Sequence, residues 1–139
     1  SGRNPLRVVI DRELEISDGY NLVHDQAPTI IFTDHNSSQE KETELSGFPV
    51  EIVRLDFEND LLNQILNQFY QRRILSLFVE GGAFTLKRFM ELGLWDEAFV
   101  FIGDQIFHSG VVAPPFPYQR IYKRCRLEET KLYVFRNSR

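Results

Sequence analysis

Residues 77–86 constrain the fold of this chain more than any other segment. The apolar run Leu77-Phe78-Val79 ends in Glu80-Gly81-Gly82, and an amphipathic helix pattern begins at once. This order predicts a strand that enters the N-terminus of a helix through a turn with almost no side-chain bulk. A phosphate can approach the bare backbone N–H groups of such a turn, and Glu80 would lie where open α/β sheets bind their ligands. Gly-Gly is also an ordinary strand-to-helix turn, so both interpretations stay open.

The rest of the chain predicts an α/β fold. Its β-branched and aromatic runs predict strands at residues 6–10, 29–33, 50–53, 74–79 and 97–102, and an antiparallel hairpin at 120–127 and 131–136. Apolar residues at helical spacing predict a helix that begins after Asn59 or Asp60 and ends near Arg72-Arg73, and another at 83–92 that Gly93 ends. Residues 34–47 are expected to form a solvated loop or a short exposed helix. Because strands and helices alternate in the middle of the chain, the sheet should be largely parallel, with antiparallel strands at one edge.

Composition excludes several classes of protein. The chain has 139 residues, enough for one domain, and a net charge of −4, which argues against a general nucleic-acid binder. No apolar run is long enough to span a membrane, and the first residues do not form a signal peptide. The single cysteine, Cys125, excludes an intrachain disulfide and fits a reducing compartment, so we expect a cytoplasmic protein.

Few side chains outside residues 80–82 indicate chemistry. Arg12 ends the first predicted strand, where it can pair with a phosphate such as the 2′-phosphate of NADPH or simply with Glu13 or Glu15 on the surface. The three histidines are far apart, and Cys125 has no partner at metal-ligand spacing, so no metal site is predicted. The sequence has no G-x-G-x-x-G, Walker A or G-x-S-x-G motif, which disfavours a conventional Rossmann domain and a serine hydrolase. No catalytic proton donor stands out.

Three segments in order resemble the bifunctional riboflavin-biosynthesis deaminase-reductase family. Residues 4–11 look like its N-P-x-R-V-V-x-D strand, Val79-Glu80-Gly81-Gly82 its reductase turn, and residues 93–97 its G-L-x-D-E segment. The resemblance covers nearly the whole chain and implies a fold similar to dihydrofolate reductase. The sheet would then be mixed and mostly parallel, flanked by helices, with the hairpin at its C-terminal end.

The resemblance also implies a reaction. NADPH would reduce the ribosyl group of 5-amino-6-(5-phosphoribosylamino)uracil to the ribitylamino product, and Glu80 would contact this small-molecule substrate. Arg12 stands near the adenosine end of NADPH, where the family commonly has a small hydroxyl residue. The residues implied to hold the cofactor phosphates are Gly82, Ala83, Phe84, Thr85, Leu86, Lys87 and Arg88.

The resemblance further implies that residues 1–139 are a single reductase domain without its first part, with the zinc-deaminase domain absent. Such a piece is expected to be inactive alone and to form a homodimer, because missing strands leave a sheet edge exposed. Two alternatives remain. The same fold can reduce a pterin or another uracil, or the chain can be a non-catalytic fragment that acts in dimerisation.

Overall fold

The structure, a computed structural model, describes residues 4–24, 27–106, 108–114 and 121–138. These residues form two compact units, residues 1–75 and 76–139, which are described separately. Arg120, the predicted first residue of the hairpin, and parts of the preceding loop lie outside the described residues.

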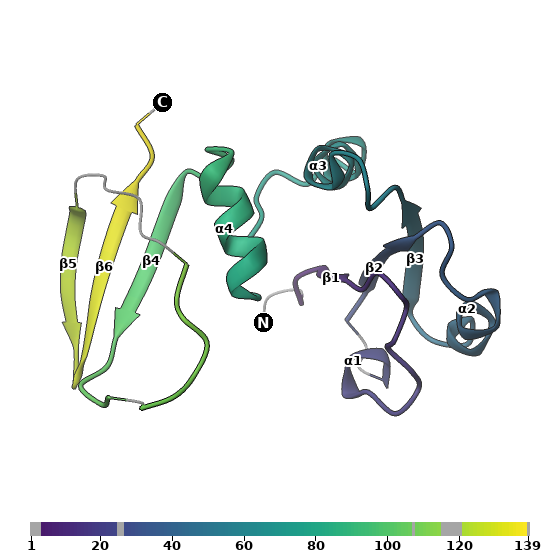
Figure 1. The fold of residues 1–139 in the computed structure, drawn as a ribbon, viewed down its shortest axis with the longest axis horizontal. Coiled ribbons are helices and arrows are strands. Elements are labelled where there is room, and N and C mark those ends of the chain that lie inside the picture. The colour runs from purple at the N-terminus through teal and green to yellow at the C-terminus, as the bar shows by residue number, and fades with distance from the viewer. Residues whose placement is uncertain (1–3, 25–26, 107, 115–120, 139) are drawn as a thin grey trace. The chain divides into compact units, whose positions relative to one another are not determined.

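The first unit is built on a parallel sheet of three strands in the order β1-β2-β3 (Figure 1). These strands are β1 (Arg7–Ile10), β2 (Thr29–Asp34) and β3 (Val50–Leu55), and each is within two residues of its predicted bounds. All six residues of β2 are buried, as expected of a central strand that is covered on both faces. Because the strands are parallel, their carboxyl ends meet at one edge of the sheet.

Helices cover both faces of this sheet. On one face Ile30 and Phe32 pack with Ile65 and Phe69 of α3 (Leu61–Gln71). On the other face Ile31 packs with Val23 of α1 (Asn21–His24) and Leu45 of α2 (Gln39–Leu45). Successive residues of β2 point to opposite faces of the sheet, and both sets are buried under helices. The unit therefore has three layers, in the order α/β/α.

The predicted helix after Asn59 or Asp60 is α3. Asp60 stands at its N-cap position, but its φ of 44° places it in the left-handed region, and its side chain does not cap the helix. The carboxylate instead accepts a hydrogen bond from Nδ2 of Asn63 at 2.8 Å. Arg72 ends the helix, as expected, and its guanidinium donates to the Gln68 carbonyl oxygen at 3.1 Å.

The second unit contains an antiparallel sheet in the order β4-β6-β5 (Figure 1). Its strands are β4 (Glu97–Ile102), β5 (Ile121–Leu127) and β6 (Thr130–Arg136), so the predicted strand and hairpin are confirmed. Asn137 fastens the end of β6 to the loop before β4, because its Nδ2 donates to the carbonyl oxygens of Gly93 at 3.1 Å and Trp95 at 2.9 Å.

Helix α4 (Ala83–Glu91) begins this unit and confirms the predicted helix at 83–92. Gly93 has a φ of +66°. Its N–H donates to the carbonyl oxygen of Met90 at 3.1 Å, and the N–H of Leu94 donates to the carbonyl oxygen of Phe89 at 2.9 Å. This pair of bonds is the Schellman ending, which requires a residue that tolerates positive φ. Gly93 therefore ends the helix as the sequence indicated.

The strand predicted at 74–79 is wrong. Residues 74–80 have no strand structure, and Leu75 and Phe78 are 98% and 73% exposed. A strand exists only where a neighbouring strand supplies ladder hydrogen bonds, and this segment has no such ladder with the described residues. The apolar run is thus not a buried strand, and the division of the chain into its two units falls within it.

Candidate functional site

The turn before α4 is open, as the glycines predicted. Gly82 is the N-cap residue with a φ of +60°, and no side chain among the described residues is seen to cap the helix. A Cβ built on Gly81 would meet nothing within 4 Å, and one on Gly82 would meet only Oγ1 of Thr85 at 3.8 Å. The first intrahelical bond runs from the N–H of Leu86 to the carbonyl oxygen of Gly82 at 3.1 Å. The N–H groups of residues 83–85 therefore have no acceptor within the helix and can meet an anion at its positive end.

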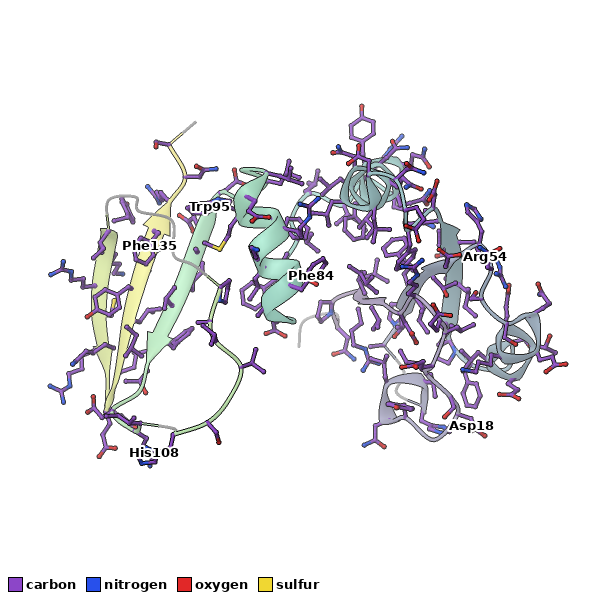
Figure 2. The ribbon with its side chains drawn as sticks, viewed as in Figure 1. Asp18, Arg54, Phe84, Trp95, His108 and Phe135 are labelled. Atoms are coloured by element: carbon purple, nitrogen blue, oxygen red, sulfur yellow. The ribbon has the colours of Figure 1, made fainter. Side chains whose placement is uncertain are left out.

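The side chains around this turn are either exposed to solvent or directed to other residues of α4. Glu80 is exposed, and Phe84 is 77% exposed and projects from α4 (Figure 2). Ala83, Thr85 and Leu86 are half-buried. Lys87 and Arg88 both pair with Glu91, at 3.5 Å and 3.6 Å, at the other end of the helix. A phosphate at this turn would thus be bound by backbone N–H groups rather than by these two cations.

Arg12 lies in the first unit, at the carboxyl end of β1. Its carbonyl oxygen accepts hydrogen bonds from the Asp34 N–H at 3.0 Å and from Thr33 Oγ1 at 2.9 Å, which fixes its backbone to the end of β2. Its side chain forms an ion pair with Glu58 and lies 3.6 Å from Glu13. The bond to Glu58 is the main cause of a raised Arg12 pKa, followed by the charge of Glu58, with smaller contributions from Asp34 and Glu13. The predicted contact with Glu13 is present, but the main partner, Glu58, is 46 residues away in sequence.

Arg54 binds the loop after β2, a role that the sequence analysis missed. Its Nη1 donates to the carbonyl oxygens of His35 and Ser37 at 2.9 and 3.1 Å, and to Ser37 Oγ at 3.0 Å. Its Nη2 and Nε bind one oxygen of Glu42, in α2, at 2.7 and 3.2 Å. Figure 2 shows Arg54 at the end of β3, where it joins the loop after β2 to its own strand. The only sign of this role in the sequence is an arginine within a mostly apolar strand. In the folded sheet this arginine lies opposite Thr33.

Asp56 shapes the turn that carries Glu58. Its Oδ1 accepts hydrogen bonds from the N–H groups of Glu58 at 2.9 Å and Asn59 at 3.2 Å, and Oδ2 accepts from Asn59 Nδ2 at 2.8 Å. The bond from the Asn59 side chain is the first cause of a lowered Asp56 pKa, followed by the bond from the Glu58 N–H. The carboxylate form of Asp56 therefore positions Glu58 at the same edge of the sheet as Arg12.

The model of the RibD C-terminal domain family matches residues 1–137 of the chain. The chain belongs to this family. The resemblance carried by residues 4–11, 79–82 and 93–97 is thereby confirmed.

Curated relatives extend this assignment. The chain is 29% identical over 131 residues to the riboflavin biosynthesis protein RibD of Aquifex aeolicus, covering 94% of the chain and 36% of that protein. It is 27% identical over 127 residues to the 2,5-diamino-6-ribosylamino-4(3H)-pyrimidinone 5′-phosphate reductase of Archaeoglobus fulgidus, covering 91% of the chain and 57% of that protein. A RibD protein of Bacillus amyloliquefaciens is also 29% identical, and the match spans 30% of its length. The chain thus spans between about a third and somewhat more than half of these relatives.

Solved structures confirm the fold. The deaminase and 5-amino-6-(5-phosphoribosylamino)uracil reductase of Thermotoga maritima superposes with a TM-score of 0.73 at 24% identity, over 99% of this chain and 39% of that one. A pyrimidine reductase-like protein of Corynebacterium diphtheriae gives 0.75 at 15% identity, over 97% of this chain and 62% of that one. The predicted α/β class, with flanking helices and a C-terminal antiparallel hairpin, is the fold of these two structures. The sheet, predicted as mixed and mostly parallel, is divided in this chain into a parallel sheet and an antiparallel sheet of three strands each.

Within the described residues of this RibD-family chain, no group of three or more His, Cys, Asp or Glu side chains is arranged to hold a metal ion. His24 packs edge-on against Phe48, with ring centroids 5.1 Å apart, and His108 is exposed. Cys125 lies half-buried in β5. Among those same residues, no helix is both long and apolar enough to cross a membrane.

We expect Asp56→Asn to reduce the acid sensitivity of the first unit. The folded state lowers the Asp56 pKa, so this carboxylate stabilises the fold above its unfolded value of 3.8 and loses that effect as the pH falls through the lower folded value. The variant should therefore be less stable than the parent at neutral pH, and the difference should vanish in strong acid. Urea midpoints measured from neutral pH down to about pH 2 check this, because Asp ionises near 4 in model peptides. Asp104→Asn removes an exposed carboxylate and is the control. Equal pH dependence of all three proteins would contradict the assigned role.

Proposed function

We propose that this chain supplies the NADPH-dependent reductase function of a riboflavin-biosynthesis enzyme. Its reaction would convert the ribosyl group of 5-amino-6-(5-phosphoribosylamino)uracil into a ribityl group. Support comes from membership of the RibD C-terminal domain family and from relatives that are named as RibD proteins and as a ribosylaminopyrimidinone phosphate reductase.

The observation that carries this proposal is the open N-terminus of α4. Gly82 holds a positive φ, there is no side-chain cap, and the space where a Cβ would stand on Gly81 is free. Backbone N–H groups at a helix N-terminus suit the phosphates of a dinucleotide. The residues present therefore fit a nicotinamide cofactor whose phosphates would meet the N–H groups of residues 83–85, at the start of the predicted Gly82–Arg88 segment.

The remaining proposed contacts divide by chemistry. NADPH, when bound, supplies the hydride that reduces C1 of the ribosyl group. Glu80, exposed just before the turn, would bind and orient hydroxyl groups of the substrate, because a carboxylate accepts hydrogen bonds from them. Arg12, at the carboxyl edge of the parallel sheet, would meet the adenosine end of the cofactor, since that edge is where parallel sheets place nucleotides.

The substrate is proposed as a pyrimidine that carries a 5-phosphoribosylamino group. The uracil form follows from the resemblance, whereas the relative from Archaeoglobus fulgidus is named for the 2,5-diamino-4(3H)-pyrimidinone form. Both share the ribosylamino group that is reduced and the 5′-phosphate. The two compounds differ in the substituent of the pyrimidine ring, which is an amino group at C2 in one and an oxo group in the uracil. Measuring turnover of both compounds therefore tells which ring the enzyme accepts.

We expect Glu80→Gln to lower kcat/KM for the phosphoribosylaminopyrimidine about tenfold in the full-length enzyme, because a charge-assisted hydrogen bond to the substrate becomes a neutral one. Loss of NADPH absorbance measures turnover, and circular dichroism checks that the fold is intact. Glu129→Gln, in the exposed turn of the hairpin, is the matched control and should leave turnover unchanged. Unchanged turnover of Glu80→Gln would remove Glu80 from the site, and no turnover by the parent enzyme with either substrate would overturn the proposed function.

We also propose that both units act within one reductase domain, because the family model runs through residues 1–137 without interruption. A homodimer would cover apolar side chains that the described strands of the second unit leave exposed, among them Phe99, Phe101 and Tyr122. A cytoplasmic location agrees with a single cysteine and with a biosynthetic role.

A further inference from the structure

Arg12 and Glu58 meet across the carboxyl end of the central strand. Arg12 follows β1 and Glu58 follows β3, and these two strands flank β2 on either side. Their backbones are fixed, since Thr33 and Asp34 bind the carbonyl oxygen of Arg12, and Asp56 binds the N–H of Glu58. The ends of all three strands therefore fix the two backbone positions from which the Arg12 and Glu58 side chains meet.

The pair lies open to solvent. The side chains of Arg12 and Glu58 are 51% and 71% exposed, so a dissolved anion can reach the guanidinium. An exposed ion pair of this kind is weak and can exchange partners. Arg12 is thus available to a phosphate, but only in competition with the carboxylate that already holds it.

The charges around Arg12 oppose a dianion. Glu58 and Glu13 contact the guanidinium, and the charge of Asp34 also acts on it. One cation among these carboxylates leaves the site with net negative charge. In dinucleotide sites an arginine accommodates a ribose 2′-phosphate, whereas a carboxylate accepts a hydrogen bond from a free 2′-hydroxyl. The carboxyl edge of this sheet carries both an arginine, Arg12, and a carboxylate, Glu58, and the two form one ion pair.

We propose that Glu58 sets the cofactor selectivity of this chain by competing with the 2′-phosphate of NADPH for Arg12. The inference rests on the proposed dinucleotide function. With Glu58 present, the edge binds phosphorylated and unphosphorylated adenosine riboses with similar affinity, because the phosphate gains Arg12 but meets the carboxylates. Without its charge, Arg12 is free for the phosphate, and the selectivity moves toward NADPH.

The test compares 2′,5′-ADP with 5′-AMP as probes of the adenosine subsite, and NADPH with NADH as the whole cofactors. Calorimetry gives each affinity for the 139-residue chain and for Glu58→Gln. We expect the parent to bind 2′,5′-ADP and 5′-AMP within about threefold of each other, and Glu58→Gln to shift this ratio about tenfold toward 2′,5′-ADP, the effect of removing one charge from beside a dianion in water. The shift should shrink near 1 M salt, where the Debye length is about 3 Å.

Glu51→Gln is the matched control. Glu51 is also exposed and pairs with an arginine, Arg72, but it lies near the amino end of β3, away from Arg12. It should leave the ratio of affinities unchanged. An unchanged ratio in Glu58→Gln, or an equal shift in Glu51→Gln, would overturn the role of Glu58 while leaving the reductase proposal intact. If neither the 139-residue chain nor the full-length enzyme bound any of the four compounds, both proposals would be overturned. Binding without reductase turnover of the full-length enzyme would overturn the proposed function alone.

Discussion

Phe32→Ala is expected to lower the free energy of unfolding of the first unit by about 3–5 kcal/mol, the cost of emptying a well-packed aromatic site. Phe32 is fully buried and packs against Phe69 of α3, with ring centroids 5.8 Å apart at 63°. The same cluster contains Ile30, Leu55 and Ile65, and all four neighbours would line the cavity that remains. Urea denaturation followed by circular dichroism measures the change.

Tyr70→Ala is the control for this variant. Tyr70 is the neighbour of Phe69 on α3 but is 82% exposed, so removal of its ring should cost about 0.5 kcal/mol or less. If the two variants had equal midpoints, the cluster around Phe32 would not be the core of the unit. Each variant removes one aromatic ring, and the two rings differ in that Phe32 is buried in the cluster whereas Tyr70 is exposed.

Arg54→Met should be the second most damaging change, at about 2–4 kcal/mol, somewhat less than the loss of one partner from a fully buried ion pair. The side chain of Arg54 is 24% exposed and binds Glu42 as well as backbone oxygens of the loop after β2. Methionine fills similar space without any donor, so those acceptors lose their partner at once. Thermal and urea unfolding give the size of the loss.

Two variants separate the causes. Glu42→Gln removes only the charge of the ion pair and should cost about 1 kcal/mol or less. Arg72→Met removes a guanidinium of similar exposure, 27%, that binds Glu51 and the preceding turn of its own helix, and should cost about 1 kcal/mol because it joins no separate loop. If Glu42→Gln were as damaging as Arg54→Met, the ion pair rather than the loop contacts would carry the effect.

The elements of this chain that could be predicted are those with local causes. Strand β2 follows from consecutive β-branched and aromatic residues, and the end of α4 follows from a glycine that can take positive φ at position 93. The open turn at Gly81-Gly82 follows from missing side chains alone. Each of these depends on neighbours within a few residues, which a single sequence displays.

The failures have distant causes. Residues 74–79 have the composition of a strand, but a strand also needs a partner, and composition cannot supply one. Asp60 has the right chemistry for an N-cap, yet its left-handed backbone leaves its carboxylate to Asn63. The pairings of Arg12 with Glu58 and of Arg54 with Glu42 join residues 46 and 12 positions apart, so only the folded sheet reveals them.

The strand order β4-β6-β5 has a consequence for synthesis on the ribosome. Strands β4 and β5 pair with β6 and not with each other, although β6 is the last of the three to be translated. Until residues 130–136 have emerged, β4 has no partner in its own sheet and its backbone N–H and C=O groups stay unpaired. Unpaired strands of this kind bind chaperones or other nascent chains. A ribosome that pauses between the synthesis of β4 and that of β6 would therefore prolong the time in which the unpaired β4 can aggregate.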